Sequence, residues 1–225
     1  MVPAQFHTLA AMSRSGLSGR RAQAARNDEA ILASAREVFV ADPDAPVSAV
    51  AEHAGVGISS LYRRYESKEA LLRKLCGDGL ARYIEIAAAA VDETAGDPWH
   101  TFATFIQRIV AADTHALTRN LAGRFTPTPE LAEAASLADD LNQRLVEHAH
   151  AAGVLRPDVT GEDLTYIFEQ VSSLHGPTPE RTAQLRARFL TLHLDSLRAP
   201  GHTRLPGPPP TADEQHARWN PSSPE

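Results

Sequence analysis

The 225-residue sequence is poor in several residue types, and each shortage excludes a class of structure. Cys76 is the only cysteine, which excludes a disulfide framework and every zinc site that needs several thiolates. No apolar run approaches the roughly 18 residues of a membrane helix. Residues 1–18 hold no long apolar segment followed by a small-residue cleavage site. We therefore expect a cytoplasmic protein with no membrane partner.

The sequence also lacks the short motifs of common enzyme classes. It contains no Gly-x-Ser-x-Gly, no Gly-x-Gly-x-x-Gly, no phosphate-binding Walker loop and no His-Glu-x-x-His. His148 and His150 lie two residues apart and so face different sides of a helix, which does not favour a metal site. We expect no catalytic residues, no cofactor and no bound metal, and an enzyme is the less favoured alternative.

The charge of the chain is acidic as a whole but unevenly distributed. A formal net charge of −6 argues, on its face, against a nucleic-acid partner. Residues 1–76, however, carry ten Lys or Arg against eight Asp or Glu, whereas residues 77–225 carry twelve against twenty. The first third of the chain is therefore compatible with DNA binding, although its small surplus of positive charge predicts weak non-specific affinity.

Apolar residues recur at helical spacing, and no stretch alternates with period two for long enough to predict a strand. We therefore expect an all-α protein. From Asn27 onward a helix is predicted whose apolar stripe consists of Ile31, Leu32, Ala35, Val38 and Phe39. Capping residues and prolines mark the later helices, which are expected near 98–116, 114–122, 129–152, 160–175 and 179–198.

Residues 47–66 predict two short helices that meet at a tight turn. Gly55 follows Ala51 by four residues and can adopt the positive φ that a helix C-terminus favours. Arg63 and Arg64 lie on the second helix, where a hairpin buried in a bundle would not display them. The pattern predicts a helix-turn-helix whose second helix enters a DNA major groove. A helical interaction protein without DNA binding is the alternative.

Residues 27–75 resemble the N-terminal DNA-binding domain of TetR-type transcriptional regulators. The first helix matches at Ile31, Leu32, Ala35 and Phe39, and the family signature matches at Ala54-Gly55-Val56, Leu61-Tyr62, Tyr65 and Lys68-Glu69-Ala70-Leu71. Two positions depart from the family pattern. Pro46 stands where a capping Ser or Thr is usual, and Ser59 stands where glycine is frequent.

The resemblance implies a role for each part of this segment. Tyr62, Tyr65 and Lys68 would contact DNA phosphates, with Ser48 as a further phosphate ligand, and Arg63 would face base edges. The full set of expected DNA-binding residues is Ser48, Gly57, Ile58, Ser59, Ser60, Tyr62, Arg63, Arg64, Tyr65 and Lys68. The resemblance further implies a ligand-responsive regulator, most often a repressor that a small molecule releases from a palindromic operator.

The C-terminal part is similar, over 152–159 and at Asp163-Leu164, to one subgroup of TetR-like regulators. In that family this part binds an effector and forms a homodimer. The expected ligand-binding residues, for which ordinary core is the alternative, are Trp99, Phe102, Phe105, Ile106, Ile109, Phe125, Tyr166 and Phe168.

The last long helix carries two apolar stripes, one at Leu185, Phe189 and Leu192 and the other at Leu190, Leu194 and Leu197. A helix with two apolar sides needs two surfaces to pack against, and a second copy of the chain would supply one of them. The expected homodimer interface consists of Leu164, Ile167, Val171, Leu174, Leu190, Leu194 and Leu197. Complete burial within one chain is the alternative.

Four parts are therefore expected along the chain. They are a flexible basic arm over 1–25, a helix-turn-helix domain over 26–76, a ligand-binding and dimerisation domain over 77–198 and a disordered Pro-rich tail over 199–225. Gly77-Asp78-Gly79 weakens a predicted helix at the start of the third part, which indicates a hinge or, alternatively, a tolerated break or a point of close packing.

Overall fold

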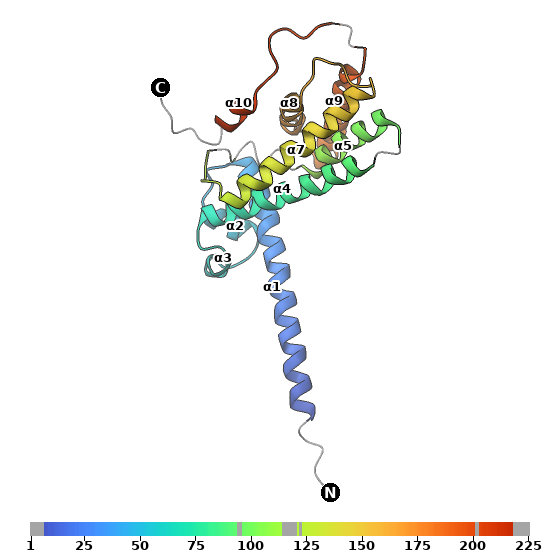
Figure 1. Ribbon diagram of the computed structural model, residues 1–225. Helices are drawn as coiled ribbons and strands as arrows, with labels where there is room; N and C mark the ends of the chain where they lie inside the picture. The colour runs from blue at the N-terminus through green and yellow to red at the C-terminus, as the bar shows by residue number, and fades with distance from the viewer. Residues whose placement is uncertain (1–6, 94–95, 114–120, 122, 201–202, 218–225) are drawn as a thin grey trace. The chain divides into compact units, whose positions relative to one another are not determined.

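The computed structural model describes residues 7–93, 96–113, 121, 123–200 and 203–217, and these ranges are built from helices (Figure 1). The helices are α1 (His7–Ala41), α2 (Val47–His53), α3 (Ile58–Arg64), α4 (Lys68–Asp92), α5 (Pro98–Ala112), α7 (Pro129–Ala151), α8 (Gly161–Ser172), α9 (Pro179–Leu197) and α10 (Ala212–Ala217). No β-strand occurs in the described ranges, which confirms the all-α prediction. The helix expected near 114–122 lies almost entirely outside the described residues.

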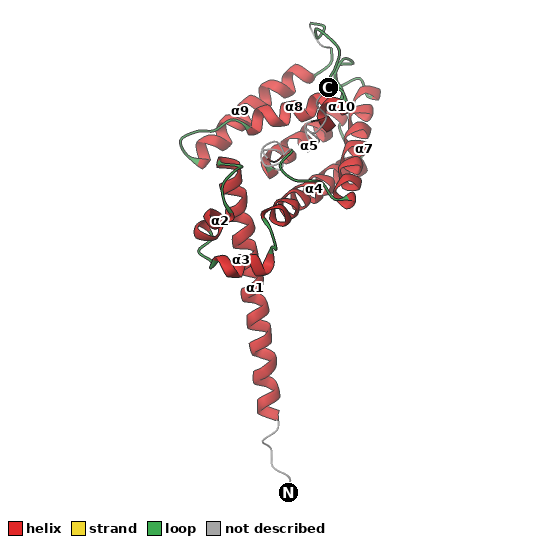
Figure 2. Ribbon diagram, turned by 90° about the vertical axis from the view of Figure 1, so that its left-hand side faces the viewer, coloured by secondary structure: helices red, strands yellow, loops and turns green. Residues whose placement is uncertain are grey.

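The chain divides into two compact units, residues 1–71 and residues 72–225. This boundary lies five residues before the one expected from composition. In the first unit, α2 and α3 lie beside the C-terminal part of α1 (Figure 2). The core of this unit includes Ile31, Ala35 and Phe39 of α1 and Leu61 of α3, all at most 2 % exposed. The apolar stripe predicted for the first helix is thus confirmed.

The N-terminal segment differs from its prediction. Composition indicates a flexible, aperiodic arm over 1–25, but α1 begins at His7, so the expectation is wrong from that residue onward. The segment contains several Ala and Arg residues, which are good helix formers. Such a sequence continues a helix that is already anchored further along the chain, and it needs no apolar stripe to do so.

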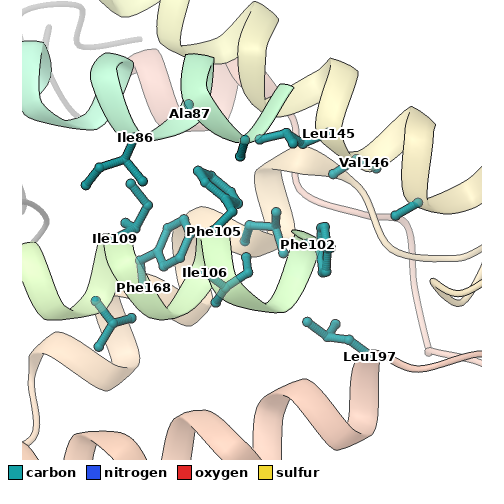
Figure 3. Packing of buried hydrophobic residues seen from close by; sticks show 14 of the residues in the cluster. Ile86, Ala87, Phe102, Phe105, Ile106, Ile109, Leu145, Val146, Phe168 and Leu197 are labelled. Atoms are coloured by element: carbon teal, nitrogen blue, oxygen red, sulfur yellow. The ribbon is translucent and has the colours of Figure 1, made fainter. Parts of the chain in front are cut away.

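The second unit is organised around α5, which contacts α7, α8 and α9. Three rings from three helices, Tyr83, Phe105 and Phe168, pack edge to face with centroid distances of 6.0 to 6.4 Å. Figure 3 shows Phe105 and Phe168 gathered with Ile106 and Ile109 in the middle of this core. Such edge-to-face pairs contribute about 0.5–1.5 kcal/mol each beyond the area they bury.

The helix starts in this unit lie where their sequence signals place them. The Asp97 carboxylate accepts a hydrogen bond from the Trp99 N–H at 2.9 Å, and Thr128 and Thr178 cap α7 and α9 in the same way. A proline occupies the first turn of each of these three helices. The Asp163 side chain closes a capping box at α8. Because caps depend on neighbouring residues only, the sequence predicts them well.

The glycines at 77–79 do not interrupt α4, which is continuous from Lys68 to Asp92. A Cβ added to Gly77 would lie 3.4 Å from the Leu131 side chain of α7, about an ordinary van der Waals distance. A hinge at Gly77-Asp78-Gly79 stays a prediction. Burial of the neighbouring Cys76 raises the pKa of its thiol to about 12.

The tail expected to be disordered over 199–225 is held against the second unit over 203–217, and this part of the prediction is wrong. The Arg156 guanidinium donates to the Thr203 carbonyl, and the Leu205 N–H donates to the Asp158 carboxylate at 3.0 Å. Further along, the Gln215 side chain donates to the Glu162 carbonyl at 3.2 Å. These bonds attach the tail mainly to the connection between α7 and α8.

Arg156 is the centre of this attachment. It forms a two-bond ion pair with Asp158, at 2.6 Å from Nε and 2.9 Å from Nη2, and its side chain is only 10 % exposed. The pair, together with the Leu205 N–H, holds the pKa of the Asp158 carboxyl below its usual range. The Arg156 N–H also donates to the Leu197 carbonyl at 3.0 Å, which joins the end of α9 to the same connection.

No helix among the described residues combines the length and the apolar character required to cross a bilayer.

Replacing Arg156 with Gln is expected to release the tail, because glutamine cannot form the two-bond pair with Asp158 or span to Thr203. Limited trypsin digestion after Arg204 should then become at least about tenfold faster, since a charge-assisted pair of this kind opposes local opening. Arg188→Gln, at an exposed arginine of α9, is the matched control and should digest like the wild type. Equal cleavage rates at Arg204 in all three proteins would contradict the attachment.

Candidate nucleic-acid interface

The turn between α2 and α3 has a defined hydrogen-bond geometry. The Val56 N–H donates to the Ala51 carbonyl at 2.9 Å, and the Gly55 N–H donates to the Glu52 carbonyl at 3.0 Å. This pair of bonds is the Schellman arrangement that ends a helix, and it places Gly55 at a φ of +65°. A side chain would be strained at that φ, so glycine sets the angle at which α3 leaves the turn.

The start of α2 departs from the usual pattern as the sequence predicted. Pro46 occupies the N-cap and provides no side-chain hydrogen bond. Ser48 lies in the first turn of α2 and is exposed. Its hydroxyl is therefore available to an outside ligand, although a phosphate contact by Ser48 stays a prediction.

One side of α3 anchors the helix and the other faces solvent. Leu61 is fully buried, whereas Ile58 and Tyr62, which lie one turn apart, are 39 % and 47 % exposed. Ser59 and Arg63 form a second exposed row one turn apart, and Ser60 is half-buried. Two adjacent rows of this kind form a continuous surface that carries hydroxyl and guanidinium groups.

Gly57 lies at the exposed start of α3. Its φ of −67° is open to any residue, and a Cβ added there would meet no atom within 4 Å. Nothing inside the chain therefore requires glycine at this position. A contact between Gly57 and DNA stays a prediction.

Two predicted phosphate ligands have partners inside the chain instead. Tyr65 is only 7 % exposed, and its hydroxyl donates to Asp28 Oδ1 at 2.7 Å. Burial, followed by the bond to Asp28, raises the pKa of this phenol. The assignment of Tyr65 as a phosphate ligand is therefore corrected: the residue closes the end of α3 against α1.

Lys68 is held by the loop between α1 and α2. Its ammonium donates to the carbonyls of Ala45 and Pro43, at 2.8 and 3.1 Å, and lies 5.1 Å from the centre of the Phe39 ring. The loop contributes backbone oxygens where the sequence gives no sign of an acceptor. Lys68 is thus a structural residue of the first unit, and a phosphate contact by it stays a prediction.

Arg64 also turns back onto the chain. Its Nε and Nη2 donate to the two oxygens of Asp28, both at 2.7 Å. This ion pair, with the bond to Asp28 as its main component, raises the pKa of Arg64. Arg63, the next residue along α3, is exposed. The structure therefore separates two arginines that the sequence places side by side.

The residues predicted to line a ligand pocket are largely those of the packed core. Phe102, Phe105, Ile106, Ile109 and Phe168 are at most 1 % exposed and belong to one packed cluster (Figure 3). The remaining candidates are the partly buried Trp99 and Tyr166 and the buried Phe125. The alternative of ordinary core describes the first five, and their contact with a ligand stays a prediction.

The predicted dimer interface is corrected by the burial of its residues. Five of its members lie in the core of one chain and are at most 6 % exposed, namely Leu164, Val171, Leu190, Leu194 and Leu197. Ile167 packs partly buried against that core, and Leu174 is half-buried. The other stripe of α9 is the accessible one, with Phe189 41 % and Leu192 55 % exposed and Leu185 half-buried.

Among the described residues, no three His, Cys, Asp or Glu side chains are grouped so that they could hold a metal ion.

A short helix presented on one side, joined by a fixed turn to a preceding helix and tied to a third, defines a helix-turn-helix protein. Family comparisons identify the type. Residues 31–75 match the family model described as "Bacterial regulatory proteins, tetR family", and residues 97–199 match "Transcriptional regulator SbtR-like, C-terminal domain". The two matches together cover well over half of the sequence. The chain belongs to the TetR family of bacterial transcriptional regulators.

Solved structures with the same fold support this classification. A TetR transcription regulatory protein from Mycobacterium vanbaalenii is 25 % identical, with 80 % of this chain and 99 % of that chain aligned at a TM-score of 0.50. The TetR-like regulator LfrR from Mycobacterium smegmatis, in complex with proflavine, is 22 % identical over 80 % and 99 %, with a TM-score of 0.60. A regulatory protein of the family from Rhodococcus RHA1 is 22 % identical over 80 % and 98 %, with a TM-score of 0.57. No curated protein matches the sequence.

Asp28 is the residue of this site that sequence reasoning missed. It lies 36 residues before Arg64 and outside the segment that carries the helix-turn-helix pattern. The only available signal was its position one turn before Ile31, at the start of the buried stripe of α1. That signal does not identify a partner.

Replacing Lys68 with Met is expected to destabilise the first unit, because methionine retains the contact with Phe39 but cannot bind the loop carbonyls. The loss should amount to about 1–3 kcal/mol, the contribution of hydrogen bonds from a charged group. Hydrogen exchange of the backbone N–H groups of Ala45 and Val47 should accelerate accordingly. Lys74→Met, at the exposed lysine of α4, is the control, and equal exchange in both variants would contradict the role of Lys68.

Proposed function

We propose that the chain is a ligand-responsive repressor that binds a palindromic DNA operator as a homodimer and leaves it when a small molecule binds. The observation that carries the DNA-binding part is the solvent-facing surface of α3. Ser59 and Arg63 form one row of this surface, Ile58 and Tyr62 the other, and Gly55 fixes the angle of the helix. Hydrogen-bonding groups on a protruding helix suit the edges of bases in a major groove.

Arg63 is the residue proposed to read a base. Its side chain is exposed at the solvent face of α3, and arginine binds the two acceptors of guanine in the most common specific contact. Ser48 and Tyr62 are proposed to bind phosphates on either side, because each is exposed and ends in a hydroxyl. Phosphate contacts position the protein, and base contacts give the sequence preference.

Replacing Arg63 with Ala is expected to relax the base preference at one position of each half-site, at a cost of about 1–3 kcal/mol in specific binding. Selection of bound duplexes from a random pool measures the preference, and competition binding measures the cost. Arg36→Ala removes an exposed arginine of α1 and serves as the control. The same selected sequence and the same affinity for Arg63→Ala as for the wild type would contradict this assignment. If the wild-type protein enriches no sequence from the random pool, DNA recognition itself is rejected.

The ligand-responsive part of the proposal rests on family likeness and on the second unit. LfrR, a structural neighbour, was crystallised with proflavine, and its fold extends over both units of this chain. The central aromatic residues fill the core, so the partly buried Trp99 and Tyr166 are the aromatic candidates for contact with an apolar effector. The acidic character of residues 77–225 favours a neutral or cationic effector over an anionic one.

The homodimer is proposed to form through α9. Its Phe189 and Leu192 are large apolar side chains left exposed by the core, and Leu185 continues their stripe. The opposite stripe of the same helix already fills the core, so a second chain is the partner that the helix still needs. A palindromic operator presents two half-sites about 34–36 Å apart, so a two-fold dimer matches its symmetry.

Replacing Leu192 with Glu is expected to convert the dimer to a monomer, because two copies would bring unpaired carboxylates into the interface. Sedimentation velocity measures the mass in solution. Leu137→Glu is a matched control, since Leu137 of α7 is similarly exposed, at 47 % against 55 % for Leu192. A monomeric wild type, or a Leu192→Glu variant that stays dimeric, would reject α9 as the interface.

A further inference from the structure

The carboxylate of Asp28 receives three hydrogen bonds from the last two residues of the α3 segment. Arg64 donates twice, from Nε and Nη2, and Tyr65 donates once, from its hydroxyl, each at 2.7 Å. Both donors lie in or directly after the last turn of α3, and Asp28 lies on α1. One carboxylate therefore fastens the end of the helix proposed to recognise DNA to the longest helix of its unit.

This fastening differs from an ordinary surface ion pair. The Asp28 side chain is 19 % exposed and Tyr65 is 7 % exposed, whereas the guanidinium-bearing side chain of Arg64 is 47 % exposed. An exposed pair with one bond contributes little, but a two-bond arginine–carboxylate pair with a largely covered carboxylate is stronger and fixes an orientation. A buried tyrosine hydroxyl on the same oxygen would lose its acceptor if the carboxylate were removed.

The helix α3 has few other restraints. It contains seven residues, only Leu61 among them is fully buried, and Gly57 provides no side-chain cap at its start. A helix of this length is not stable alone, so its direction depends on contacts with its neighbours. The Asp28 contacts restrain the C-terminal end, and the Gly55 turn restrains the other. Without the former, α3 is free to pivot about Leu61.

We propose that Asp28 is a positioning residue for DNA recognition, and that Arg64 acts through Asp28 to set the direction of α3 rather than as a phosphate ligand. The inference rests on the proposed DNA-binding function. Arg63 then reaches bases because Arg64 and Tyr65 hold the helix that carries it. An alternative role for Arg64, a direct phosphate contact, makes opposite predictions for salt dependence.

The test uses the full-length chain and the duplex that the wild type selects from a random-sequence pool, with a scrambled duplex of the same composition. Asp28→Ala, Arg64→Ala and the double variant should each lose about tenfold in the ratio of specific to non-specific affinity. The double variant should lose no more than Asp28→Ala alone, because removal of Asp28 already breaks every contact that Arg64→Ala removes. The salt slope of Arg64→Ala should equal that of the wild type.

Two further variants separate positioning from loss of folding. Tyr65→Phe keeps the buried ring and removes only the hydroxyl, and Arg64→Lys keeps the positive charge but cannot form the two-bond pair. Both should fold, as judged by circular dichroism at the temperature of the binding assay, and both should lower the specificity ratio in the same direction. Glu29→Ala, one residue along α1 and exposed, is the charge control and should match the wild type.

The outcomes distinguish this inference from the function on which it rests. If the wild type selects no duplex, both the proposed DNA-binding function and the inference about Asp28 are rejected. A wild type that selects a duplex, with Arg64→Ala lowering the salt slope by about 1 and Arg64→Lys restoring it, would show a phosphate contact and overturn the inference alone. Additive losses in the double variant, or an unchanged specificity ratio in Asp28→Ala, would overturn it equally.

Discussion

A seven-residue helix cannot hold its own shape in water, and the interface of this protein depends on what holds α3. Leu61 supplies the apolar contact, the Gly55 turn fixes the first end and the Asp28 carboxylate fixes the second. Each restraint comes from a different physical source: burial, backbone geometry and charge-assisted hydrogen bonding. Because the three act on one short element, its free side can carry polar residues selected for a partner and contribute nothing to folding.

The same arrangement explains which parts of the site were predictable. The turn depends on one glycine that follows Ala51 by four residues, and the exposed rows of α3 follow from helical periodicity. Both features can therefore be predicted from neighbouring residues. The partners of Arg64, Tyr65 and Lys68 are remote. Asp28 lies 36 residues from Arg64, and Lys68 binds backbone carbonyls, which every residue possesses. No pattern of side chains in the sequence predicts that a backbone carbonyl will accept a hydrogen bond from Lys68.

The second unit shows a similar division. Its caps and most of its helix bounds follow from neighbouring residues, but the two stripes of α9 are equally apolar in sequence. Which one meets α5 and α8 is decided by tertiary packing, and the structure buries Leu190, Leu194 and Leu197 while it leaves Phe189 and Leu192 exposed. The attachment of the tail does not follow from its sequence for a related reason. Its prolines indicate disorder, whereas its attachment uses backbone groups that bind Arg156 and Asp158.

The single cysteine, Cys76, determines how the protein reacts with thiol reagents. Burial raises the pKa of the Cys76 thiol to about 12, so the reactive thiolate is scarce near neutral pH. The Cys76 side chain is partly exposed, so its reactivity depends on the low thiolate fraction and not on burial alone. Because Cys76 is the only cysteine, a thiol-reactive label attaches to the natural chain at a single position, within α4.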